Sequence, residues 1–193
     1  MFARLTGLIF AATLALSGVA RAELGDDGLH IAPWLNQTFM DLREDLGDAN
    51  AQGKRLAVII EQRGCIYCSR MHEEVWVEPD ILRLLEEEFF FIRINMHGST
   101  EVTDFDGETM EEREIARRWR NLFTPTILFF PEDVPEDVTG IEAAAVVMPG
   151  AFGRWTTFNM LNWVLEKGYE GEEDFQRYHA RMFADQAAAG AME

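Results

Sequence analysis

The chain has 193 residues, and its 34 acidic and 17 basic side chains give a formal net charge of -17. A surface this acidic repels a phosphate backbone, so the composition excludes nucleic acid as a partner; it favours solubility and, as an addition, steering of a basic partner. The length fits one domain with a single core, and the sequence contains no internal repeat.

Residues 1–22 predict an export signal. Arg4 gives a positive start, residues 5–16 are apolar, and small residues up to Ala22 supply a cleavage site. The apolar stretch is shorter than the roughly 20 residues that span a bilayer, which favours cleavage over an uncleaved membrane anchor. We expect the mature chain to begin near Glu23 and to lie in the periplasm, where disulfides form.

The first half of the mature chain predicts helices on either side of a strand. Apolar spacing predicts a helix over residues 30–53, and the apolar, β-branched run 55–60 predicts a buried central strand. Helical spacing returns from 65 to about 77, where Pro79 interrupts it, and continues over 80–88. The expected buried stripe of the first helix is Trp34, Leu35, Phe39, Leu42 and Leu46.

The middle of the chain predicts two further strands. Residues 89–94 are apolar and aromatic, typical of a second buried strand, and the polar, glycine-bearing segment 95–110 predicts a loop or small hairpin. A helix is expected over 111–120, and residues 126–130 form the third strand. The aromatic residues expected in the core here are Trp119, Phe123, Phe129 and Phe130.

The last third completes an α/β pattern. The acidic, proline-containing segment 131–139 predicts a turn, and 143–148 a fourth strand paired antiparallel with the third. A core helix is expected over 156–166 and one more over 172–186. This order predicts a central mixed sheet of about four strands, with helices on both faces.

The only two cysteines, Cys65 and Cys68, fall on the expected strand-to-helix turn. A strand that delivers a Cys-x-x-Cys pair to the start of a helix is typical of a thiol-disulfide redox site. We expect Cys65 to be the nucleophile, because free N–H groups and the helix dipole favour a thiolate there, and Cys68 to resolve the mixed disulfide. This cycle needs no bound cofactor.

Other uses of the cysteines fit less well. A structural disulfide is disfavoured, because a two-residue spacer closes almost no loop. Zinc could take Cys65, Cys68, His72 and His97, but the spacing from Cys68 to His72 is poor. Covalent haem is excluded by Ser69, where its attachment motif requires histidine. We therefore expect neither a metal nor a cofactor.

The order of elements, the Cys65-x-x-Cys68 turn and the Thr124-Pro125 pair resemble the thioredoxin superfamily over roughly residues 31–168. In that family the matching proline is cis and lies against the cysteines, although the sequence leaves the isomer open. The resemblance implies a thioredoxin-like domain over 23–168, followed at 169–193 by a helix and frayed tail. The implied catalytic residues are Cys65, Cys68 and Pro125, and the expected substrate contacts are Ile66, Tyr67 and Thr124.

Segments 61–68, 95–98, 102–107 and 123–126 more closely resemble the SoxW-type periplasmic thioredoxins of sulfur-oxidation systems. This resemblance implies a reductant of disulfide-bearing periplasmic proteins that receives electrons from a membrane thiol transporter. We expect it to act as a monomer.

The direction of electron flow stays open, because the Ile66-Tyr67 spacer departs from the Gly-Pro of cytosolic thioredoxins. A disulfide oxidant or isomerase, and a non-catalytic binding protein of the same fold, are the alternatives. Ile59 holds the place of the buried aspartate of cytosolic thioredoxins, so Glu61 is either the proton acceptor for Cys68 or a partner in a surface salt bridge.

Two further groups are interpreted as structural. His72 and Trp76 lie four apart on one helix face and are expected to pack. Asp104, Asp106 and Glu108 lack the other ligands and the spacing of a calcium loop, so we interpret them as turn residues.

Overall fold

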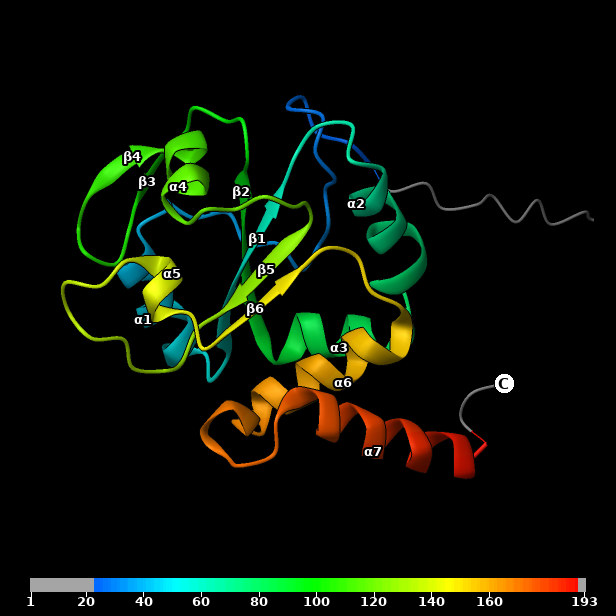
Figure 1. Ribbon diagram of the computed structural model, residues 1–193. Coiled ribbons are helices and arrows are strands. Elements are labelled where there is room, and N and C mark those ends of the chain that lie inside the picture. Colours follow the sequence, from blue (N-terminus) through cyan, green and yellow to red (C-terminus); the bar gives the residue numbers. More distant parts are fainter. Residues whose placement is uncertain (1–22, 191–193) are drawn as a thin grey trace, which may run out of the picture.

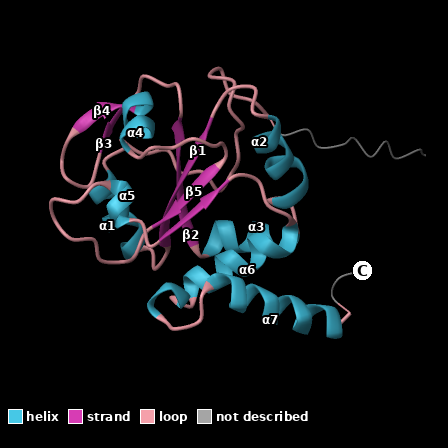
Figure 2. Ribbon diagram, viewed as in Figure 1, coloured by secondary structure: helices cyan, strands magenta, loops and turns pink. Residues whose placement is uncertain are grey.

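The computed structural model of the chain describes residues 23–190 (Figure 1). The predicted export signal at 1–22 lies outside that part of the chain. Within it, no helix is both long enough and apolar enough to cross a membrane. A central sheet runs through the molecule, with helices packed on both of its faces (Figure 2).

The sheet has four strands in the order β2-β1-β5-β6. Strand β1 (Arg55–Glu61) pairs parallel with β2 (Phe89–Asn95) and antiparallel with β5 (Thr126–Phe129), which in turn pairs antiparallel with β6 (Val146–Pro149). The predicted mixed sheet is confirmed, as is the antiparallel pairing of its last two strands. Because β1 is an inner strand, its C-terminal end lies between the ends of its neighbours β2 and β5 (Figure 1).

One face of the sheet is covered by α1 (Leu42–Ala51), α4 (Glu112–Arg118) and the short α5 (Gly140–Ala143). A two-stranded hairpin, β3 (Glu101–Thr103) with β4 (Thr109–Glu111), lies beside α4. The hairpin falls inside the segment predicted as a loop or small hairpin. The short α5 has no counterpart in the sequence prediction, because a four-residue helix is too short to show a period.

The other face is covered by α2 (Ile66–Arg70), the π-helical turn η1 (Met71–Val75), α3 (Pro79–Glu87) and α6 (Arg154–Leu165). The C-terminal α7 (Phe175–Ala188) packs on α6 rather than on the sheet. These helices begin and end within three residues of the predicted bounds. The last turn, η2 (Gly168–Glu170), connects α6 to α7.

All seven residues of β1 are buried, because successive side chains point to opposite faces and helices cover both. Ala57 and Ile59 enter the core beneath α3 and α6, whereas Val58 and Ile60 enter the core beneath α1 and α4. Residues 23–190 therefore form two hydrophobic clusters, with the sheet between them.

The predicted helix over 30–53 is wrong in its first half, since α1 begins only at Leu42. Met40 has a positive φ of 61°, and the Asp41 side chain caps the helix by accepting from two backbone N–H groups. Upstream, Leu35 forms a parallel bridge with Phe91 of β2, so residues before Met40 follow the sheet. Phe39, expected to be inward, is 97% exposed.

The prediction that Phe123 belongs to the core is also wrong, because its side chain is 60% exposed. The other three aromatic residues of that group, Trp119, Phe129 and Phe130, are buried as expected. Phe123 lies in the loop between α4 and β5, where no helix or strand covers it. Its exposure leaves an aromatic ring on the surface next to Thr124.

Candidate active site

The two cysteines lie just beyond the C-terminal end of β1 and are joined by a disulfide, with their Cα atoms 5.2 Å apart. Cys65 is the N-cap of α2, and its Sγ accepts a hydrogen bond from the backbone N–H of Cys68 at 3.0 Å. Cys65 is 8% exposed, whereas Cys68 is completely buried. Cys65 is thus the sulfur that a partner can approach, and Cys68 can reach only Cys65.

The Thr124-Pro125 loop approaches the same sulfur. The Thr124 hydroxyl donates to Cys65 Sγ at 3.3 Å, and the Thr124 carbonyl oxygen lies 3.4 Å from it. The Thr124-Pro125 peptide bond is cis, which settles the isomer that the sequence left open. Beyond it, the backbone N–H of Gly150 donates to the Pro125 carbonyl at 2.7 Å, which ties the loop to the edge strand β6.

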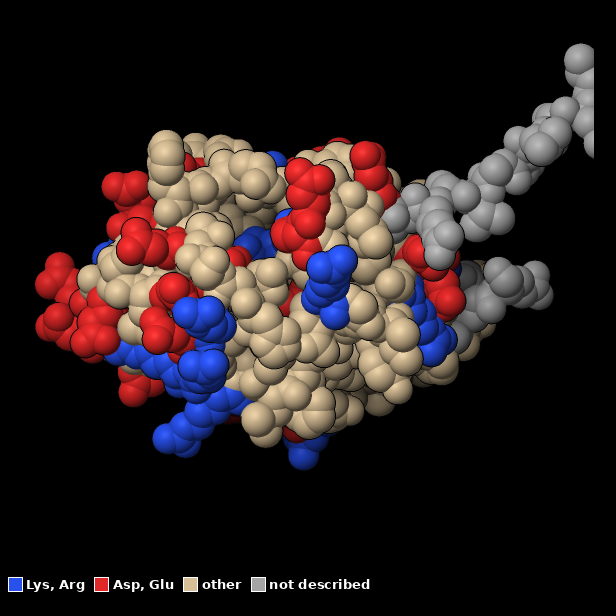
Figure 3. Space-filling view, turned by 90° about the horizontal axis from the view of Figure 1, so that it is seen from above, with Lys and Arg blue, Asp and Glu red and all other residues tan. Residues whose placement is uncertain are grey.

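Several exposed apolar side chains lie close to Cys65 in the chain or in the loop that contacts it. Ile66 is 73% exposed and Tyr67 is also exposed, and both follow Cys65 directly. Leu122 and Phe123, likewise exposed, precede Thr124, which contacts Cys65. Viewed from above, Asp and Glu side chains gather most densely at the left side of the molecule, and much of the lower centre of the view is uncharged (Figure 3). Large exposed apolar side chains close together are typical of surfaces that bind other proteins.

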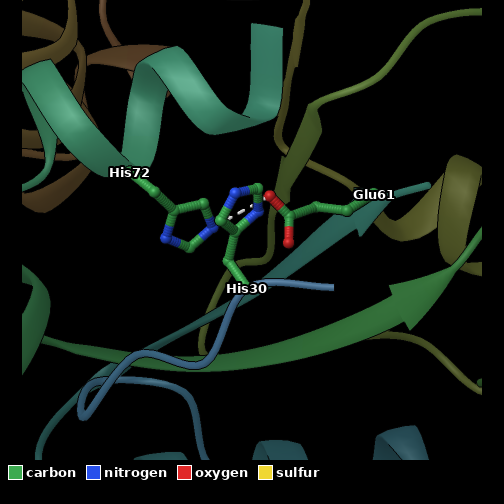
Figure 4. Close-up of side chains that lie close together, drawn as sticks. All are labelled: His30, Glu61 and His72. Atoms are coloured by element: carbon green, nitrogen blue, oxygen red, sulfur yellow. Dashed lines mark hydrogen bonds and ion pairs between the residues drawn. The ribbon is translucent and has the colours of Figure 1, made fainter. Parts of the chain in front are cut away.

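Glu61, the last residue of β1, is completely buried, so the alternative of a surface salt bridge is wrong. Its Oε1 lies 3.0 Å from Nε2 of His72, which belongs to η1 (Figure 4). His72 also packs edge-on against Trp76 at a centroid distance of 4.5 Å, as the predicted packing of this pair requires. Glu61 therefore faces η1, which directly follows the helix that carries Cys68, and not solvent.

His30 completes this group and was missed by the sequence analysis, which placed it at the start of a helix. Its ring stacks on that of His72 with centroids 4.3 Å apart, and the Ser69 hydroxyl lies 3.1 Å from its Nε2. Burial, followed by the neighbouring His72, lowers the pKa of His30. No local pattern pointed to His30, because its partners are distant in sequence.

The four-residue zinc set considered from the sequence does not assemble. Cys65 and Cys68 are joined to each other, and His97 is exposed, with its Nε2 3.0 Å from Gln62 Oε1. Among residues 23–190, the ligand-type side chains that do come together are those of His30, Glu61 and His72.

Asp104, Asp106 and Glu108 form a turn, as predicted, since the N–H of Asp104 donates to the Glu108 carbonyl at 2.9 Å. Asp104 also has a role that the sequence did not indicate. It is buried and accepts hydrogen bonds from the Trp119 indole and the Gly140 backbone. These contacts make it a structural anchor between the hairpin and α5.

Residues 42–145 match the family described as "Thioredoxin-like domain". A thioredoxin-fold protein from Helicobacter pylori superposes with a TM-score of 0.55 at 18% identity, covering 73% of this chain and 87% of that chain. A thioredoxin from Thermus thermophilus shares 28% identity with a TM-score of 0.49, covering 65% of this chain and 85% of that chain. Comparison with curated protein sequences finds no match.

The family match covers more than half of the chain, and the Helicobacter pylori structure supports the fold independently. The matched segment includes both cysteines and the Thr124-Pro125 loop. A paired dithiol at the start of a helix is the chemistry of thiol-disulfide exchange. The chain therefore belongs to the thioredoxin-like domain family and is a thiol-disulfide oxidoreductase.

Proposed function

We propose that the protein reduces disulfides of other proteins in the periplasm. The observation that carries this proposal is the asymmetry of the cysteine pair, in which Cys65 reaches the surface beside Thr124 and Cys68 is buried behind it. An attacking sulfur must meet a partner, whereas a resolving sulfur need only meet the first sulfur.

The catalytic cycle begins with the reduced pair. The Cys65 thiolate attacks one sulfur of the partner disulfide, that S–S bond breaks, and the other partner sulfur leaves as a thiolate that takes a proton from water. Cys68 then loses its proton and attacks Cys65 Sγ, which releases the second partner sulfur and leaves the intramolecular disulfide. Two electrons pass from the dithiol to the partner, and Glu61 is the proposed acceptor of the Cys68 proton.

Ile66, Tyr67 and Thr124 are the proposed substrate contacts. The two exposed side chains of the spacer and the exposed Phe123 give a partner an apolar surface next to Cys65. Apolar contact holds a partner without selecting for charge, which suits an enzyme that meets disulfides in proteins of differing sequence. Pro125 is proposed as catalytic through its place in the loop that contacts Cys65.

The proposed cellular setting is the periplasm. The predicted signal at residues 1–22 supports export, with cleavage near Ala22, and the SoxW-type resemblance supports a role in sulfur oxidation. A periplasmic reductant needs its own electrons, because that compartment is oxidising; a membrane thiol transporter is the proposed supply. N-terminal sequencing of the periplasmic protein tests export, with Glu23 as the expected first residue.

The reaction is tested with insulin as the disulfide substrate. The wild type is expected to reduce it, Cys65→Ser to lose the activity, and Cys68→Ser to accumulate a mixed disulfide through Cys65 that is visible as a mass increase. A Cys65→Ser variant that works at the wild-type rate would contradict the assignment. If the reduced wild type leaves Cys65 unreactive toward alkylation near neutral pH, the protein is a binding protein of this fold instead.

The direction of electron flow is tested by the reduction potential of the Cys65–Cys68 pair. A value near the ~-270 mV of thioredoxin supports a reductant. A value near the ~-120 mV of a strong oxidant overturns that direction in favour of disulfide formation. Refolding of a scrambled multi-disulfide protein separates an isomerase from both.

A further inference from the structure

A cluster of three ligand-type side chains lies buried beneath the helix that carries Cys68. His30 comes from the N-terminal segment, Glu61 from the end of β1 and His72 from η1 (Figure 4). One ligand atom from each lies within 4.8 Å of the other two, and all three residues are buried. Three segments distant in sequence thus bring two imidazoles and a carboxylate to one point.

The cluster is incomplete as it stands. Glu61 Oε1 faces His72, but within the described chain Glu61 Oε2 is buried and has no hydrogen-bond partner. A buried carboxylate oxygen without a partner has lost the hydrogen bonds that water would give it, and this destabilises the folded chain. The ring of Trp34 stacks on that of His72 with centroids 5.8 Å apart, and the ring of Trp76 contacts His72 edge-on. Aromatic rings therefore cover the His72 side of the cluster.

We infer that His30, Glu61 and His72 form a binding site for one divalent transition-metal ion of the Zn²⁺ class. Two imidazole nitrogens and a carboxylate oxygen are the protein ligands of many zinc sites, with a fourth position left open. Nitrogen-rich sites select such ions over Mg²⁺ and Ca²⁺, which prefer oxygen. This inference is independent of the proposed reductant function.

The distances suit such an ion. Zinc binds nitrogen and oxygen at about 2.0–2.2 Å, which puts tetrahedral ligand atoms about 3.4 Å apart. His72 Nε2 and Glu61 Oε1 are already 3.0 Å apart, and the widest separation in the group is below 4.8 Å. Side-chain rotations that move the ligand atoms by about an ångström would assemble the site. A carboxylate that binds the ion through both oxygens would also give Glu61 Oε2 a partner.

The surroundings of His30 position it for binding. The Ser69 hydroxyl lies 3.1 Å from His30 Nε2, which leaves Nδ1 for the ion. The second nitrogen of a metal-binding histidine is commonly held by such a partner. The Arg93 guanidinium donates to the His30 carbonyl and pairs with Asp27, which fixes the segment on the sheet.

The binding test uses purified oxidised protein, because the disulfide prevents Cys65 and Cys68 from binding the ion. Titration calorimetry with Zn²⁺ and the visible absorption of Co²⁺ are measured at about 0.15 M salt with excess Mg²⁺, which screens adventitious binding to the acidic surface. We expect one ion per chain. His30→Gln, Glu61→Gln and His72→Gln are each expected to weaken Zn²⁺ binding at least 100-fold.

His97→Gln is the matched control, because it removes an exposed imidazole and is expected to keep the wild-type affinity. Circular dichroism shows whether each variant folds. Imidazole NMR of the wild type supplies a readout that needs no variant: Zn²⁺ is expected to shift the signals of His30 and His72 but not those of His97. Absence of stoichiometric binding to the wild type, or equal loss in the His97→Gln control, would overturn the inference.

Discussion

The carboxyl group of Asp45 is a buried acid that the fold holds at a cost. Asp45 lies on the inward side of α1 with 2% of its surface exposed, and its Oδ2 has no hydrogen-bond partner among the residues that the structure describes. Burial raises the pKa of Asp45 to about 6; the Thr38 hydroxyl opposes the rise, and Asp41, Asp48 and Glu44 add to it.

The raised pKa makes the protein less stable as the pH rises. An unfolded aspartate has a pKa of about 3.9, so between about pH 4 and 6 the folded state holds a proton that the unfolded state loses. The contribution of this bound proton to the free energy of unfolding is fully present below about pH 4 and is lost as the pH rises through 6. A shift of about two pKa units is worth about 3 kcal/mol, which is the expected destabilisation at pH 7.5.

Asp45→Asn removes the ionisation and keeps the shape of the side chain. At pH 7.5 the free energy of unfolding of the variant is expected to be about 3 kcal/mol higher than that of the wild type. Its melting temperature is expected to be roughly 6–12 °C higher. At pH 4 the two proteins are expected to have nearly equal stability. Urea unfolding of both oxidised proteins at several pH values between 4 and 7.5 measures the difference.

Asp48→Asn is the matched control, because it changes the net charge equally at an exposed position of the same helix. We expect it to change the unfolding free energy by no more than about 0.5 kcal/mol at any of these pH values. The reasoning is refuted if the advantage of Asp45→Asn is constant with pH, or if Asp48→Asn stabilises as much at pH 7.5.

Three further substitutions test the packing and the site. Gly140→Ala is expected to cost about 1–3 kcal/mol in urea unfolding, because a Cβ there would overlap the Trp119 ring. Phe123→Ala is expected to leave stability within about 0.5 kcal/mol but to lower kcat/KM for insulin about five-fold or more, with a small aromatic disulfide reduced at the wild-type rate. Thr124→Val removes the hydroxyl that donates to Cys65 Sγ. Such a hydrogen bond stabilises the thiolate, which is the form that reacts, so alkylation of reduced Cys65 near neutral pH is expected to slow several-fold.

The sheet could be predicted from the sequence because its strands are buried on both faces. Residues 55–60 and 89–94 are nearly continuous apolar runs, which is how a strand between two helical layers appears in sequence. The cysteine motif could be placed for a related reason, since a strand end followed by helical spacing fixes the turn between them. These features depend on neighbours within about ten residues.

The errors arise where distant contacts decide the conformation. Helical spacing upstream of Met40 was misleading, because Leu35 pairs with Phe91 of β2, and no local pattern reports that bridge. Phe123 looks like a core residue by its chemistry, yet nothing packs over it. His30 reaches Glu61 only because the N-terminal segment that carries it folds back against the sheet. The cluster of His30, Glu61 and His72 therefore had no signature in the sequence.

The two roles of Glu61 exclude each other, and that gives a test that connects them. As a free carboxylate, Glu61 is proposed to take the proton of Cys68; bound to an ion, it cannot. Zn²⁺ is therefore expected to slow release of the mixed disulfide in the wild type. Zinc also binds free dithiols, so inhibition alone decides nothing. His30→Gln keeps both cysteines and the carboxylate but lacks one ligand, so Zn²⁺ is expected to slow its release step much less than that of the wild type. If the wild type and His30→Gln are inhibited equally, the ion acts at the cysteines and the proposed link through Glu61 fails.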